Sequence, residues 1–200
     1  MRNTIIKSAV ALALGIPLIA SAESNFTTGV GTPLTATAKV DFTIVILKFI
    51  SLRVGAAGVG VFDSIVFTIP AANVGVGGAQ AGTGGDLTGG VVTAKVTGNN
   101  GQVTLTSTAT GALSNGVGDT IPFTQITTAT AVLTSATALP APTLTNGVSA
   151  GVLAALTGTK ITNQDAKWTY SYANAAVVAA GTYGGVNLNN GRVTYTASMP

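Results

Sequence analysis

The chain has 200 residues, of which only 8% are charged, whereas 26 are Gly and 32 are Thr. The formal net charge is +3, but two of the nine basic residues, Arg2 and Lys7, lie in an expected leader segment, which leaves seven basic against six acidic residues. No Lys/Arg cluster remains, so we expect no nucleic-acid partner, because that binding needs clustered cations. Cys and His are both absent, so disulfides, the commonest general base and the imidazole metal ligand are missing.

The first residues have the pattern of a secretory signal peptide. Arg2 and Lys7 form a positive region, an apolar stretch runs from Ala9 to Ala20, and small residues follow up to Ala22. This pattern predicts cleavage after Ala22 and a secreted protein at the cell surface. The remaining 178 residues suit one domain with a core of its own.

In the segment from residue 34 to 46, "LTATAKVDFTIVI", apolar residues occupy every second position. This is the period of a half-buried strand. Apolar character continues to Val54, but one strand of 21 residues would be about 70 Å long, more than such strands usually reach. We therefore expect either a bulge near Leu47 and Lys48 or a first half that lies outside the parent domain. The predicted organisation is a signal peptide over 1–22, an N-terminal extension over 23–46 and one β-sandwich domain over 47–200.

Several shorter strands are expected further along the chain. Residues 61–69 form one candidate, and residues 71–90 are too rich in glycine for a regular element. The segments "VVTAKV" and "QVTLTSTAT" flank "TGNNG", which predicts a hairpin with an Asn-Gly turn. One or two strands are expected in 121–134, a short helix or a strand near 148–156, and two or three strands after Lys167. Seven to nine short strands with turn signals between them favour an all-β, immunoglobulin-like antiparallel β-sandwich.

The acidic residues carry little indication of a site. Asp86 and Asp119 lie in glycine-rich turns, where a single Asp is ordinary. A calcium ion held there by one carboxylate and loop carbonyls is the alternative interpretation. The sequence contains no nucleophile elbow, phosphate-binding loop or dinucleotide fingerprint. We therefore expect no enzymatic activity, no cofactor and no catalytic or metal-binding residues.

Trp168, Tyr170 and Tyr172 alternate in "WTYSY" and so share one face of a strand. An exposed aromatic platform for glycans is one interpretation. A core strand, whose rings fill the space between two sheets, is the interpretation that we favour.

The C-terminal segment "WTYSYANAAVVAAGTYGGVNLNNGRVTYTAS" resembles the end of chaperone–usher-type pilins, which finish with an Ala-Gly-x-Tyr/Phe turn and an alternating strand. The N-terminal "LTATAKVDFTIVI" resembles the extension that such subunits lend to a neighbour. The resemblance covers both ends of the chain, and the middle by composition alone. It implies a fibre subunit, in which a strand from the next copy completes the sandwich.

The resemblance also assigns residues and partners. Val40, Phe42, Ile44 and Ile46 would be the side chains of the donor strand that enter a groove, and Val193 and Tyr195 would line that groove. The partners would be copies of the same chain, with a periplasmic chaperone and an outer-membrane usher during export. The alternative hypothesis is a self-contained secreted domain that serves as a surface or matrix protein or as a carbohydrate-binding module.

Overall fold

The computed structural model describes residues 25–31, 33–58, 60 and 62–200. The expected signal peptide, residues 1–22, lies outside the described residues. The chain divides into two units, Met1–Ile46 and Leu47–Pro200. We call the described part of the first unit the N-terminal tract (residues 25–46, without residue 32) and the second unit the β-domain.

The N-terminal tract contains no strand among its described residues. The four side chains expected to enter a groove are all exposed: Val40 by 68%, Phe42 by 89%, Ile44 by 84% and Ile46 by 78%. The alternation of this segment had predicted a strand. A segment with one apolar face becomes a strand only when it pairs with a sheet edge and buries that face, because the alternating pattern supplies no hydrogen bonds of its own.

The β-domain has a larger sheet of six strands, all antiparallel to their neighbours. The strand order is β1-β5-β12-β11, and β3 and β9 also pair with the long strand β12. The strands are β1 (Ile50–Val54), β3 (Gln80–Ala81), β5 (Val91–Gly98), β9 (Ile126–Ala131), β11 (Leu156–Gly158) and β12 (Ile161–Tyr172).

A smaller sheet has the order β10-β6-β13, again antiparallel. Its strands are β6 (Thr104–Ala109), β10 (Val152–Leu153) and β13 (Val193–Ser198). Two short pairs complete the strands: β2 (Ile65–Val66) with β4 (Thr83–Gly84), and β7 (Leu113–Ser114) with β8 (Thr120–Ile121). The helical elements of the described chain are two 3₁₀ turns, η1 (Ala71–Asn73) and η2 (Phe123–Gln125). Among the described residues no helix is long and apolar enough to cross a membrane.

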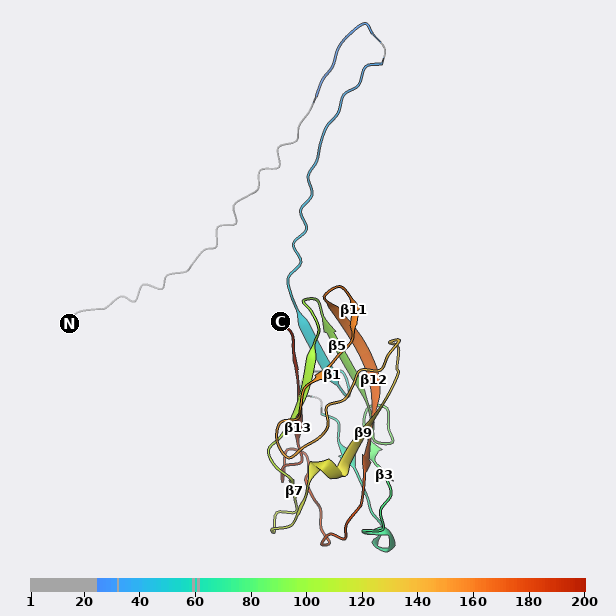
Figure 1. Cartoon of the computed structure of the whole chain (residues 1–200), viewed down its shortest axis with the longest axis vertical. Helices are drawn as coiled ribbons and strands as arrows, with labels where there is room; N and C mark the ends of the chain where they lie inside the picture. Colours follow the sequence, from blue (N-terminus) through green and yellow to red (C-terminus); the bar gives the residue numbers. More distant parts are fainter. Residues whose placement is uncertain (1–24, 32, 59, 61) are drawn as a thin grey trace, which may run out of the picture. The chain divides into compact units, whose positions relative to one another are not determined.

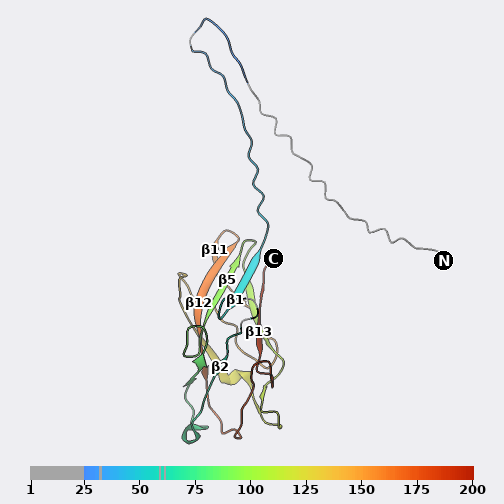
Figure 2. The same ribbon diagram turned by 180° about the vertical axis from the view of Figure 1, so that it is seen from behind.

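The two sheets share one core, so the fold is all-β and antiparallel and is consistent with a β-sandwich (Figures 1 and 2). Val92, Ala94 and Val96 of β5 and Ala166, Trp168 and Tyr170 of β12 are buried in one cluster with Leu105 and Ala109 of β6. The largest buried side chain is Trp168, whose indole N–H donates to the Leu139 carbonyl at 2.9 Å. Trp168, Tyr170 and Tyr172 are 0%, 7% and 7% exposed, so these three aromatic side chains are core residues.

The hairpin expected around Thr97–Gly101 does not form, so this prediction is wrong. Strands β5 and β6 do form on either side of it, but β5 belongs to the larger sheet and β6 to the smaller one. The connection instead crosses from one sheet to the other. The Asn99 side chain is bonded to residues 47 and 49, and the Gly101 amide donates to the Lys160 carbonyl at 2.9 Å. These tertiary bonds outweigh the local preference of Asn-Gly for a tight hairpin turn.

The segment between β9 and β10 closes one side of the β-domain. It carries the buried side chains of Leu139 and Leu144, and it is anchored to β12 through Asp165. The Asp165 carboxylate accepts hydrogen bonds from the backbone N–H groups of Thr134 (2.8 Å) and Ser135 (2.9 Å) and from the Thr134 hydroxyl. Burial opposes ionisation of Asp165, but these hydrogen bonds prevail and hold the pKa of its carboxyl well below the ordinary value.

Replacing Asp165 with Asn should lower the free energy of unfolding at pH 7 by about 1–2 kcal/mol, because charge-assisted hydrogen bonds are lost. The lowered pKa means that the folded state favours the charged form. Its contribution is therefore complete above the unfolded pKa of 3.8 and is lost as the pH falls below that value. Urea unfolding at several pH values measures this difference, which should shrink on acidification. A pH-independent difference would contradict the assignment.

Candidate functional site

The side of the β-domain opposite the segment between β9 and β10 has two free strand edges. Within the described part of the chain, β1 pairs with β5 alone and β13 pairs with β6 alone. These two strands lie close together, one from each sheet, but do not pair with each other. Each therefore presents unpaired backbone N–H and C=O groups, which are a template for another strand.

Apolar side chains of both edge strands pack against the core and remain partly exposed. Leu52 and Val54 come from β1, and Val193, Tyr195 and Ala197 come from β13. All five are only partly buried, although they pack against the core. We call these five residues the edge groove. They alternate with exposed residues along both strands, which is the spacing that an inserted strand would match.

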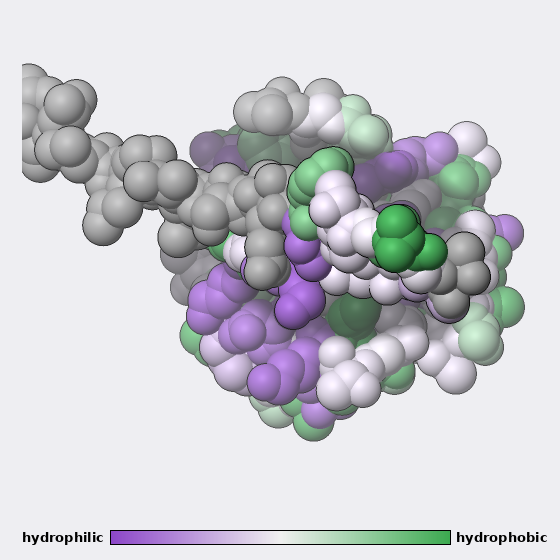
Figure 3. Space-filling model, turned by 90° about the horizontal axis from the view of Figure 1, so that it is seen from above, coloured by the Kyte–Doolittle hydropathy of each residue, from purple (hydrophilic) through white to green (hydrophobic). Residues whose placement is uncertain are grey.

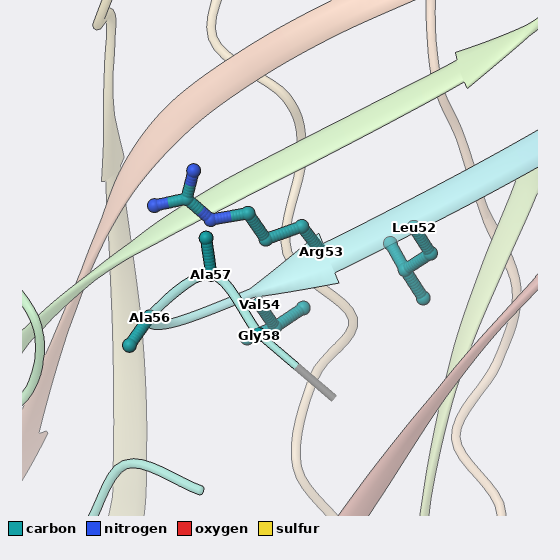
Figure 4. A pocket seen from close by; sticks show the side chains of 6 residues that line it. All are labelled: Leu52, Arg53, Val54, Ala56, Ala57 and Gly58. Carbon is teal, nitrogen blue, oxygen red and sulfur yellow. The ribbon is translucent and has the colours of Figure 1, made fainter. Parts of the chain in front are cut away.

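A hollow of about 280 Å³ opens beside β1, lined by Leu52, Arg53, Val54 and residues 56–58. Figure 4 shows Leu52 and Val54 on one side of the strand and Arg53 on the other. The Arg53 guanidinium pairs with Asp86 at 3.3 Å, and Thr93 donates its backbone N–H to the same carboxylate at 2.7 Å. Arg53 thus fixes the outer side of β1, while the side facing the groove is apolar.

Tyr195 fixes the position of β13 against the core. Its ring lies 5.3 Å from that of Trp168, and its hydroxyl is 2.8 Å from the Tyr170 hydroxyl on β12. Burial raises the pKa of Tyr195 to about 12, so both hydroxyls remain protonated at neutral pH. This bond links the two sheets and holds β13 against the core.

The start of the β-domain is also held firmly. The Phe49 N–H donates to the Asn99 side-chain oxygen at 2.8 Å, and the Asn99 amide donates to the Leu47 carbonyl at 2.8 Å. The Lys48 ammonium donates to the carbonyl of Pro200 at 3.1 Å. The last residues before β1 are therefore part of the folded domain and lie beside the C-terminus. Seen from above, green apolar and purple hydrophilic residues are interspersed over the surface (Figure 3).

The residues predicted to line a groove lie on a free edge. Val193 and Tyr195 are on β13 and pack, partly buried, against the core, while Val40, Phe42, Ile44 and Ile46 lie on the N-terminal tract, in the other unit. Sequence reasoning missed Leu52 and Val54. Their alternation with Ser51 and Arg53 in "ISLRV" could have found them, had the long apolar run been divided at Leu47.

The structure gives less support to the other candidate sites, a calcium site and a glycan platform. Among the described residues no three acidic side chains gather into a possible metal site. Asp86 is engaged by Arg53 and Thr93, and the carboxylate of Asp119 accepts a hydrogen bond from the Asn115 amide at 2.8 Å. The aromatic side chains of "WTYSY" are buried and so are unavailable as a glycan platform.

No protein-family model, no curated protein and no solved structure matches the chain.

Proposed function

We propose that the protein is a structural subunit of an extracellular fibre and that it assembles by β-strand donation. The N-terminal tract of one copy pairs with the free edge of β13 in the next copy. Val40, Phe42, Ile44 and Ile46 then occupy the edge groove. The role is association, with no catalysis and no cofactor, and the donated strand completes an immunoglobulin-like sandwich.

The observation that carries this proposal is that the edge strands of the β-domain and the N-terminal tract are complementary. The edge strands β1 and β13 carry half-buried apolar side chains, and the tract has four exposed apolar side chains at every second position. Donated strands commonly bind in this way, with backbone hydrogen bonds for affinity and alternate side chains for specificity.

The free energy gained by burying the four side chains can be compared with the entropy cost of ordering the tract. Burying four such side chains contributes about 6–12 kcal/mol, whereas ordering a seven-residue backbone costs about 7–14 kcal/mol. Burial and ordering therefore nearly cancel, and the hydrogen bonds to the free edge decide the balance. For this reason a preformed edge, held by the Tyr170–Tyr195 bond, favours assembly.

The proposal includes partners during export. An open apolar edge invites nonspecific pairing, so a periplasmic chaperone that covers β13 and an outer-membrane usher that exchanges it for the tract are consistent with this surface. Both partners, and secretion to the cell surface, follow from the resemblance to chaperone–usher pilins and from the expected signal peptide.

Negative-stain microscopy of the secreted protein tests the proposal directly. The full secreted chain should form thin fibres, whereas a chain without residues 23–46 should remain folded and monomeric, because it retains the acceptor but lacks the donor. A synthetic peptide of residues 34–46 should bind this monomer and raise its melting temperature.

A uniformly monomeric secreted chain would overturn the proposal and favour the self-contained secreted domain. Fibres that form equally well without residues 23–46 would also overturn it. A peptide in which Phe42 and Thr43 are exchanged has the same composition but disrupts the alternation, and it serves as the control for binding.

A further inference from the structure

The joint between two subunits is short. If Ile46 lies in a neighbour's edge groove, only residues 47–49 separate it from Ile50, the first residue of β1. Four residue steps span at most about 14 Å. The Asn99 side chain holds residues 47 and 49 within their own domain, so there is no slack linker. The two domains must therefore touch near this joint.

The direction of the donated strand decides which surfaces touch. The end of the β-domain with the start of β1, Asn99 and the C-terminus is here called the joint end. The opposite end, which carries the η1 loop, the β7–β8 turn and the loop before β13, is called the loop end (Figure 1). Strand β13 runs from the loop end towards the joint end. A donated strand antiparallel to β13 therefore places Ile46 at the neighbour's loop end.

Only this orientation gives a fibre. If the donated strand were parallel to β13, the joint end of the donor would meet the joint end of the acceptor. Two copies would then exchange tracts with each other and form a closed pair. The antiparallel orientation joins unlike ends, and unlike ends repeat without closure. It also extends the smaller sheet in the antiparallel manner of its existing strands.

The lengths then identify the contact residues. Seven residues of tract, Val40 to Ile46, span about 23 Å, and the six residues of β13 span about 20 Å. Ile46 therefore reaches the level of Val193, and the next residues of the donor lie over the loop that precedes β13. Leu47 (80% exposed) and Phe49 (51%) project from the donor there, and Val186 (71%) and Leu188 (61%) project from that loop.

Hydrogen bonds attach the loop before β13 to the β7 region of the domain. The Asn189 carbonyl accepts the Ser114 N–H at 3.0 Å, the Gly184 N–H donates to the Ser114 carbonyl at 2.8 Å, and the Asn190 amide donates to the Ala112 carbonyl at 2.9 Å. A side chain at Gly191 would collide with the backbone of Gly185 at 2.3 Å. Val186 and Leu188 are thus exposed apolar side chains on a loop that is hydrogen-bonded to the domain.

We propose that consecutive copies make a second contact, in which Leu47 and Phe49 of the donor pack on Val186 and Leu188 of the acceptor. This inference rests on the proposed strand donation and adds a specific end-to-end surface, whose partner is another copy of this chain. This contact, together with the hydrogen bonds of the Asn99 side chain to residues 47 and 49, makes the joint between copies stiff.

The chain has no cysteine, so the contact can be tested by placing a pair of them. A Leu47→Cys/Leu188→Cys variant changes only exposed positions, and a short bismaleimide should convert its fibres into a ladder of covalent multimers in denaturing gels. The matched control is Leu47→Cys/Val76→Cys, because Val76 is 73% exposed in the η1–β3 connection, which lies at the loop end but away from β13.

The outcomes separate the two proposals. A ladder from the Leu47/Leu188 pair, together with little crosslinking of the control, supports the contact. Normal fibres without a ladder, or with equal ladders from both pairs, overturn the contact and leave strand donation standing. Covalent dimers from Leu47→Cys alone would show that two joint ends meet. This result would overturn the antiparallel orientation of the donated strand on β13. An absence of fibres from the unsubstituted chain overturns strand donation itself, and the contact with it.

Discussion

Replacing Phe42 with Asp is expected to abolish fibre formation while leaving the β-domain folded. Phe42 is 89% exposed in the single chain, so the substitution costs the monomer little. In the edge groove it would remove a large apolar side chain and bury a carboxylate without a partner. A loss of about 4 kcal/mol would weaken each junction roughly 1,000-fold. Negative-stain microscopy and sedimentation of the secreted variant measure the effect.

The matched control for this prediction is Thr43→Asp. It adds the same charge at the adjacent residue, which faces away from the groove in an alternating strand. Fibres should form with Thr43→Asp and be absent with Phe42→Asp. Equal effects of the two substitutions would show that charge, rather than the face of the strand, controls assembly, and this would contradict the assigned donor face.

Replacing Trp168 with Ala is expected to destabilise the β-domain by about 3–5 kcal/mol, because it leaves a large cavity in the core. The side chain is fully buried, and its loss also leaves the Leu139 carbonyl without its hydrogen-bond donor. Domains of this size are stable by only about 5–15 kcal/mol, so a large part of the total would be lost. The shift of the urea midpoint, measured on the non-assembling Phe42→Asp chain, gives this quantity.

The Trp168→Phe variant separates packing from hydrogen bonding. It keeps an aromatic ring against Tyr195 and removes the indole N–H, so a smaller loss of about 1–2 kcal/mol is expected. Since the Trp168 ring supports Tyr195 on β13, the Ala variant should also assemble more slowly where it is still folded. An unchanged urea midpoint for Trp168→Ala would contradict the core role of this residue.

The alternation of the sequence predicted much of the fold. The inward set of β12, with Trp168, Tyr170 and Tyr172, follows from period two and large apolar volume, and the structure confirms its burial. The strand at Val193–Ser198 follows from the same signal. These predictions succeeded because a residue's face in a strand depends on local geometry alone.

The pairing of the strands could not be predicted in the same way. Asn99 and Gly101 form a good local turn signal, but their side-chain and backbone bonds go to Leu47, Phe49 and Lys160, which are remote in sequence. Likewise, the anchoring of residues 134–135 by Asp165 leaves no periodic trace, because it depends on one carboxylate and two backbone amides. The free edges of β1 and β13 are visible only once all pairs are known.

In the proposed assembly, the number of neighbours that each copy can bind follows from one contrast in the β-domain. The segment between β9 and β10 closes one side, whereas the edges of β1 and β13 are free on the other. One side is filled by its own chain, with Leu139 and Leu144 in the core, so the proposed strand donation would use the edge of β13 and one tract per copy. In the proposed fibre each copy would therefore act once as donor and once as acceptor, and the polymer would be linear, unbranched and polar. One terminus of such a fibre would carry an unoccupied acceptor edge and the other an unused tract. A variant that lacks residues 23–46 would therefore act as a chain terminator, and its molar fraction would set the average fibre length.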